Sequence, residues 1–228
     1  MNIDECKEIA ARKAASFVEP GMVVGLGTGS TASFFVRCLA ERVAQGLEIT
    51  GIPTSEATRE LAAGLGIKLG SLDDYPELDI AIDGADEVEK GTLNLIKGLG
   101  GALLREKFIA QAAKRFVVIV DATKPVTSLG ERVPVPVEVV RFGVKSTLAR
   151  LIKAGAKTVR ARRTLQGDSF ITDNGNYVLD CSFGLIEDAA ALAERLDSIV
   201  GVVEHGLFVG MTQDVIIARE DEIEQWSV

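Results

Sequence analysis

Length, composition and charge limit the kind of protein that this chain is. With 228 residues, 47% of them hydrophobic, it has enough apolar surface for one large domain or two modest ones. A net charge of −8, from 33 acidic and 25 basic residues, removes the positive field on which nonspecific nucleic-acid binding depends. The chain has no apolar run as long as a membrane span and begins with charged residues, so we expect a cytoplasmic globular protein with no membrane partner.

The cysteines and the single histidine argue against a metal centre. Cys6, Cys38 and Cys181 lie far apart in sequence, form no CxxC pair, and have only His205 to complete a ligand set. We expect reduced thiols in the core or at the surface. His205 has no GxSxG nucleophile to serve, so its expected role is structural or interfacial.

The first 124 residues alternate helical and strand patterns. Apolar periodicity predicts helices at 3–18, 30–44, 56–65 and 102–114, and strands at 22–27, 47–53, 78–83 and 116–121. This alternation predicts an α/β fold, an open and mostly parallel sheet with helices on both faces. Ligands of such sheets collect at the carboxyl ends of the strands, where we therefore look for the chemistry.

The remaining residues follow a different pattern. Strands at 135–140, 157–163, 177–183 and 201–208, with helices at 144–155 and 187–198, give the βαββαβ order of a ferredoxin-like α+β domain. A further apolar strand within 211–221 could return to the first sheet. We therefore expect an α/β catalytic domain of residues 1–131 and 209–228, and a smaller domain of residues 132–208 inserted into it and used in oligomerisation.

The first glycine-bearing loop, GLGTGSTA at 25–32, joins a strand to a helix. The N–H groups of residues 28–31 and the hydroxyls of Ser30 and Thr31 can converge there on an oxyanion, which the helix dipole also attracts. The loop lacks the third glycine of a dinucleotide fingerprint and the GK[ST] end of a Walker loop, so a phosphomonoester fits it better than a nucleotide. The alternative is a tight turn in which Ser30 or Thr31 is an ordinary N-cap.

The second loop, DGADEVE at 83–89, ends the strand of residues 78–83. Asp83 and Asp86 are expected to lie near one another, and Gly84 allows close approach of the backbone. Two neighbouring carboxylates share proton-transfer work on sugar hydroxyls. The alternatives are a solvated acidic turn or a loop that binds a divalent metal, although no histidine or further acidic cluster lies nearby in the sequence.

The third loop, KGLGGALLREK at 97–107, brings Lys97 and a helix start together. Residues Leu103, Leu104, Phe108 and Ile109 form the expected apolar face of the helix, and Glu106 lies near its edge. Glu106 is then either a solvent-exposed helix residue or a partly desolvated base. Lys124 follows the strand of residues 116–121 and should reach the same sheet edge, whereas Lys7 is a weaker phosphate candidate.

Six segments in order closely resemble the ribose-5-phosphate isomerase A family, and the likeness spans nearly the whole chain. They are GTGST at 27–31, DGADE at 83–87, KGLGGALLREK at 97–107, DATK at 121–124, TDNGN at 172–176 and GVVEHGLF at 201–208. The one departure is Leu99, where the family often has glycine. The resemblance implies isomerisation of ribose 5-phosphate to ribulose 5-phosphate, no cofactor or required metal, and a homodimer or homotetramer.

The resemblance also implies the roles of individual residues. Glu106 would accept the proton and Asp83 would assist ring opening. Substrate contacts would come from three loops and a lysine: Thr28, Gly29, Ser30, Thr31, Asp83, Gly84, Ala85, Asp86, Lys97, Gly98, Leu99, Gly100 and Lys124.

Two other functions are compatible with such loops. A coenzyme A transferase would use a glutamate as a nucleophile and form a covalent thioester. A sugar-phosphate sensor of a transcription regulator would use a related fold without catalysis. The acidic composition, the missing helix-turn-helix segment and the full set of proton-transfer residues argue against a sensor.

Overall fold

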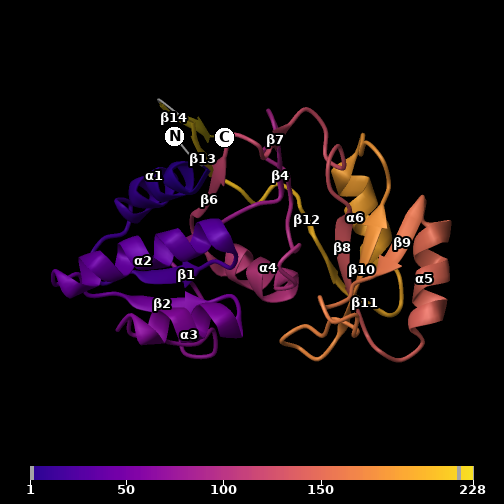
Figure 1. Ribbon diagram of the computed structural model, residues 1–228, viewed down its shortest axis with the longest axis horizontal. Helices are drawn as coiled ribbons and strands as arrows, with labels where there is room; N and C mark the ends of the chain where they lie inside the picture. Colours follow the sequence, from indigo (N-terminus) through magenta and orange to yellow (C-terminus); the bar gives the residue numbers. More distant parts are fainter. Residues whose placement is uncertain (1–2, 220–221, 228) are drawn as a thin grey trace. The chain divides into compact units, whose positions relative to one another are not determined.

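A computed structural model describes residues 3–219 and 222–227, which form two compact units (Figure 1). The first unit contains the described residues up to 85, residues 105–124, and the described residues from 211 onward. The second contains residues 86–104 and 125–210. These bounds differ from the domain boundaries expected from sequence, because residues 86–104, 125–131 and 209–210 group with the second unit.

A six-stranded sheet forms the centre of the first unit, in the order β14-β13-β6-β3-β1-β2. All its pairs are parallel except that of β14 with β13. The apolar strand expected in the tail is β13, which pairs with β6 and confirms the return to this sheet. The strands are β1 (Val23–Leu26), β2 (Thr50–Pro53), β3 (Ile80–Asp83), β6 (Phe116–Asp121), β13 (Asp214–Ala218) and β14 (Ile223–Ser227).

Helices cover both faces of this sheet, as expected for an open α/β fold. Three of them, α1 (Ile3–Ala15), α2 (Ser30–Ala44) and α3 (Glu56–Gly64), contribute to one apolar core with alternate residues of the strands, including Val24 and Ile82. Helix α4 (Leu103–Ala112) meets the other face, where a Cβ atom on Gly25 would lie 2.5 Å from the Ile109 side chain. The small residues Gly25 and Ala81 thus let α4 approach the sheet closely.

The second unit contains a ferredoxin-like domain. Its elements are β8 (Val135–Val139), α5 (Val144–Lys153), β9 (Thr158–Ala161), β10 (Tyr177–Ser182), α6 (Ala189–Asp197) and β11 (Val202–His205). The antiparallel sheet has the order β11-β8-β10-β9, and alternate strand residues such as Val137 and Leu179 share a core with Leu151 and Leu192 of the two helices. The predicted βαββαβ order is confirmed.

A second sheet in this unit was not expected from the sequence. Its strands β4 (Glu87–Glu89), β5 (Leu95–Ile96), β7 (Pro125–Val126) and β12 (Leu207–Phe208) have the order β12-β5-β4-β7. Strands of two or three residues leave no readable period in a sequence. The buried Glu87 carboxylate accepts backbone N–H bonds from Gly130, Arg132 and Val133, which ties residues 130–133 to β4.

The single strand predicted at 201–208 is in fact two strands of different sheets, divided at Gly206. The Gly206 N–H donates to Pro136 O, and its own carbonyl accepts from Lys97 N. A Cβ atom at Gly206 would lie 2.1 Å from Lys97 O, so only glycine fits where the chain passes from one sheet to the other.

The cysteines are thiols in the core. Cys6, Cys38 and Cys181 are all free and buried, and burial raises the pKa of the Cys181 thiol to about 12.

Among the residues that the structure describes, no helix combines the length and the apolar character needed to cross a bilayer.

Candidate active site

The carboxyl ends of the parallel strands bring several candidate residues of the first unit to one edge of the sheet. Strand β1 leads into the loop at 27–29, β2 into Thr54, β3 ends at Asp83, and β6 leads into the turn that contains Lys124. Because these strands are parallel neighbours, their carboxyl ends share an edge. Helix α4 leads into β6, and its first turn contains Glu106.

The loop after β1 ends in a helix start without a side-chain cap. Gly29 is the N-cap of α2, with φ 105°, and no side-chain hydrogen bond caps the helix. The alternative in which Ser30 or Thr31 serves as N-cap is therefore wrong. Ser30 is exposed and Thr31 is 9% exposed, so the first N–H groups of α2 and these hydroxyls form a site suited to an anion.

Three hydroxyl groups anchor the side chain of Thr28. Its Oγ1 lies 2.7 Å from Thr54 Oγ1, 2.8 Å from Ser55 Oγ and 3.1 Å from Thr58 Oγ1. Thr58 also donates to Gly27 O, and Ser55 caps α3 by accepting from Thr58 N. The sequence reasoning missed this cluster; its only signal was a run of hydroxyl residues directly after the strand at 47–53.

Asp83 is buried and oriented by backbone donors. It is 2% exposed, and its Oδ1 accepts from Thr28 N at 3.0 Å and Gly84 N at 2.7 Å. Gly27 makes this approach feasible, because a Cβ atom there would lie 2.2 Å from Asp83 Oδ1. The structure thus brings Thr28, Asp83 and Gly84 together, a contact between the first two loops that the sequence analysis did not predict.

Glu106 is a buried carboxylate on the inward stripe of α4. Residues 103, 106, 107 and 110, which share one face of a helix, are all buried, and Glu106 itself is 4% exposed. The expected apolar face was wrong at Phe108, which is 57% exposed. A glutamate and a lysine hold two positions of a buried stripe that apolar residues normally occupy, which indicates a functional role.

An ion pair fixes the first turn of α4 beside α3. Arg105 Nη1 donates to Glu56 Oε1 at 2.9 Å. The hydrogen bond from Arg105, followed by that from Arg59, lowers the pKa of the Glu56 carboxyl. The Glu56 carboxylate thus holds Arg105, the residue next to Glu106 in the chain.

The remaining loop residues belong to the second unit. Lys97 is 2% exposed, and its Nζ lies 5.5 Å from the centroid of the Phe208 ring. Asp86 Oδ2 accepts from Leu99 N at 3.0 Å, so Asp86 orders the loop that follows Lys97. Asp83 and Asp86, expected as a pair, engage backbone donors of different loops.

The two further lysines differ in their surroundings. Lys124 is half-buried in a turn where its N–H donates to Asp121 O and Thr123 donates to the Asp121 carboxylate. Lys7 lies on α1 and pairs with Asp4 at 3.3 Å. Lys124 stays a substrate candidate because it follows β6 at the carboxyl edge of the sheet.

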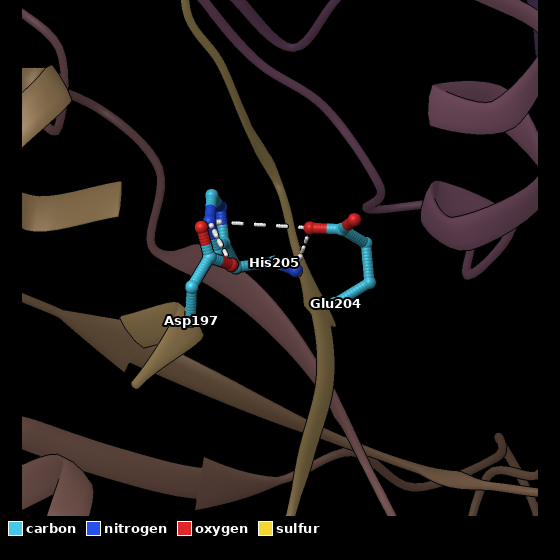
Figure 2. Close-up of side chains that lie close together, drawn as sticks. All are labelled: Asp197, Glu204 and His205. Carbon is cyan, nitrogen blue, oxygen red and sulfur yellow. Dashed lines mark hydrogen bonds and ion pairs between the residues drawn. The ribbon is translucent and has the colours of Figure 1, made fainter. Parts of the chain in front are cut away.

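His205 belongs to a hydrogen-bonded cluster with Asp197 and Glu204 (Figure 2). One ring nitrogen of His205 and one carboxylate oxygen of each acid lie within 4.8 Å of one another. His205 is 2% exposed, its Nδ1 accepts from Leu207 N at 3.2 Å, and its Nε2 lies 3.2 Å from Asp197 Oδ1. Since Nδ1 accepts, the proton of the neutral ring is on Nε2, the nitrogen that would have to bind a metal. We therefore interpret this cluster as a structural hydrogen-bond network.

Taken together, an uncapped helix start and buried carboxylates on a parallel α/β sheet define an enzyme class that binds a phosphorylated substrate and transfers protons.

Comparison with known proteins identifies the family within this class. Residues 50–222 match the family model of ribose 5-phosphate isomerase A (phosphoriboisomerase A). The ribose-5-phosphate isomerase A of Gluconobacter oxydans is 59% identical over 220 residues, which are 96% of this chain and 95% of the relative. That of Synechococcus sp. is 57% identical over 222 residues, which are 97% of this chain and 96% of the relative.

Solved structures agree over the whole chain. A D-ribose-5-phosphate isomerase in complex with phospho-erythronic acid has a TM-score of 0.96 at 39% identity and covers 100% of both chains. The enzyme from Methanocaldococcus jannaschii has a TM-score of 0.94 at 40% identity, with 98% of this chain and 99% of that chain covered. The chain belongs to the ribose-5-phosphate isomerase A family. It is an aldose-ketose isomerase that converts ribose 5-phosphate to ribulose 5-phosphate through an enediolate, in the non-oxidative pentose phosphate pathway.

Proposed function

We propose that residues 28–31 hold the phosphate of ribose 5-phosphate. The observation that supports this is the helix start of α2, whose cap is Gly29 and whose first N–H groups have no side-chain acceptor. Binding energy from the phosphate, which does not react, then positions the carbon atoms that do. The Thr28 side chain, held by the hydroxyl cluster, keeps this loop in place before the substrate arrives.

Glu106 acts as the base in this proposal. Its carboxylate removes the C2 proton of the open-chain aldose and returns it to C1, while a proton passes from the C2 hydroxyl to the C1 oxygen, so that the C1 carbonyl becomes a hydroxyl and C2 becomes the carbonyl. Lys97 and the N–H groups of Gly98 and Gly100 stabilise the negative oxygen of the enediolate between these steps. The burial of Glu106 in the first turn of α4 supports this role, because a carboxylate that is shielded from water is placed to act on a bound substrate.

Asp83 assists opening of the furanose ring by proton transfer. Two backbone N–H groups hold its Oδ1, which orients the carboxylate while the aldose ring opens. The other proposed substrate contacts are Gly84, Ala85, Asp86, Gly98, Leu99, Gly100 and Lys124. The substrate carbonyl itself serves as the electron sink, so the proposed mechanism requires neither a metal nor a cofactor.

Turnover in the presence of a chelator tests the metal-free mechanism. Purified protein in excess EDTA is expected to convert ribose 5-phosphate to ribulose 5-phosphate at the rate measured without EDTA. Ketose formation is followed directly, with each divalent metal added back in turn as the control. Activity that EDTA abolishes and one metal restores would make Asp83 and Asp86 candidate metal ligands and would contradict the mechanism.

We also propose a homodimer or homotetramer assembled through the ferredoxin-like domain. Three large apolar side chains of the second unit are strongly exposed: Phe142 at 93%, Val200 at 83% and Leu165 fully. A partner that covers these side chains would remove apolar surface from water. Light scattering should give a multiple of the 24.3 kDa chain mass; a mass of 24.3 kDa at micromolar concentration would contradict an assembly.

The cytoplasm is the proposed location, because phosphorylated pentoses are charged metabolites of the cell interior. Cell fractionation should recover the chain with cytoplasmic marker enzymes, and recovery with periplasmic or membrane markers would contradict the proposal.

A further inference from the structure

One arginine holds the carbonyl groups of the loop that follows Lys97. Arg162, directly after β9, donates from Nη1 to Gly98 O and to Leu99 O, both at 2.9 Å. The same guanidinium donates from Nε to Asp180 Oδ2 at 3.0 Å and from Nη2 to Asp180 Oδ1. Arg162 thus connects a carboxylate on β10 to two consecutive carbonyls of the loop.

Burial makes this connection rigid. The side chains of Arg162 and Asp180 are 11% and 21% exposed, so water competes little for their hydrogen bonds. The planar guanidinium makes all four bonds at once, a geometry that the single nitrogen of a lysine cannot reproduce. The Phe170 ring adds to the support: its centroid lies 5.7 Å from Arg162 Cζ, and a Cβ atom on Gly101 would lie 2.4 Å from the ring.

The N–H groups of the loop divide into two kinds. Leu99 N donates to Asp86 Oδ2, and Gly101 N donates to Gly98 O. Among the residues that the structure describes, the N–H groups of Gly98 and Gly100 donate to no protein acceptor. Along the loop, the N–H groups of Gly98 and Gly100 alternate with those of Leu99 and Gly101, which already have acceptors. The Gly98 and Gly100 N–H groups can therefore donate to an oxygen atom of a ligand.

We propose that Arg162 is a positioning residue for the isomerisation. It binds the carbonyls of Gly98 and Leu99 and so fixes the backbone of this loop, including the Gly100 N–H, which shares a peptide plane with the Leu99 carbonyl. The N–H groups of Gly98 and Gly100 then donate to the enediolate oxygen. This inference rests on the proposed substrate contacts of residues 97–100. Because the donors matter most when negative charge develops, loss of Arg162 should affect kcat more than KM.

Steady-state kinetics of matched arginine variants test the inference. Arg162→Lys keeps the positive charge but loses the planar guanidinium that makes the four hydrogen bonds. We expect kcat to fall by about 10- to 100-fold, with KM within about twofold of wild type, because small displacements of aligned catalytic groups lower the rate by this much. Arg163→Lys is the control, because Arg163 is exposed and its Nη1 donates only to Gly167 O. Arg162→Ala should regain activity when guanidinium ions are added, but not with ammonium at equal ionic strength. Asp180→Asn, which keeps the arginine, should fall between Arg162→Lys and wild type.

Thermal unfolding of every variant separates positioning from folding. A kcat of Arg162→Lys equal to that of Arg163→Lys would overturn the inference, as would a loss that follows the unfolded fraction. The Lys97→Ala variant shows whether such a result overturns only the role of Arg162 or also the proposed function of the loop. If Lys97→Ala is nearly inactive while Arg162→Lys is normal, only the role of Arg162 is overturned. If Lys97→Ala turns over normally, the proposed substrate loop itself is wrong, and the role of Arg162 with it.

Discussion

Glu106→Gln is expected to lower kcat by about 10²- to 10⁴-fold, the usual contribution of a positioned general base. Glutamine has the size of glutamate and fits the same buried position on α4, but its amide cannot accept the C2 proton. The proposed phosphate site on α2 is unchanged, so the affinity for substrate should stay within a few-fold of wild type. A large loss in kcat with little change in binding identifies an interaction used in the transition state.

Two readouts check this expectation. Turnover of ribose 5-phosphate gives kcat, and titration calorimetry with phospho-erythronic acid gives binding without chemistry. Glu60→Gln is the matched control, because Glu60 is an exposed helix glutamate of the same unit and should turn over at the wild-type rate. A Glu106→Gln enzyme within about tenfold of wild type would remove Glu106 from the role of base.

Asp83→Asn is expected to lower the conversion of ribose 5-phosphate by about 10²-fold, because the amide cannot transfer a proton during ring opening. Asparagine keeps an Oδ1 that accepts from Thr28 N and Gly84 N, so the loop geometry should survive. The effect should therefore be confined to the step in which the ring opens.

Hydrogen exchange from the ketose side isolates that step. Ribulose 5-phosphate cannot close a five-membered ring, because the oxygen needed for closure carries the phosphate. In D₂O, the variant should therefore still exchange the C1 hydrogen of ribulose 5-phosphate at nearly the wild-type rate, whereas Glu106→Gln should lose this exchange. Asp73→Asn, at an exposed position, is the control. An exchange rate that falls as far as net conversion would contradict a role limited to ring opening.

Periodicity predicted the helices and the strands of four or more residues in the two main sheets, except β14, and none of the strands of two or three residues. Helix α2 has the predicted bounds of 30–44, and β6 those of 116–121, because long amphipathic or fully apolar segments carry a strong pattern. Strands β4, β5, β7 and β12, with two or three residues each, carry none. Strand β14 was missed for another reason: it is an edge strand with alternating exposed residues and only one hydrogen-bonded neighbour.

The parts of the candidate site that could be predicted from the sequence are those that depend on residues close together in the chain. The loop that precedes α2 and the position of Asp83 at the end of β3 were predicted from local motifs, whereas the Gly29 cap and the bonds from Thr28 N and Gly84 N to Asp83 were not. The side chains that hold these loops in place come from distant parts of the sequence. Arg162 acts on a loop that lies 63 residues earlier, and no pattern near Leu99 indicates an arginine partner.

The sequence by itself determined the fold class, the ferredoxin-like order of the second unit and the loops that carry chemistry, because these depend on short-range periodicity and on glycine positions. Only the tertiary structure decided that Glu106 is buried, that Gly206 divides one apparent strand between two sheets, and that Thr54, Ser55 and Thr58 hold Thr28. Burial and side-chain partners depend on which distant segments pack together, and packing is a property of the folded chain that no local pattern encodes.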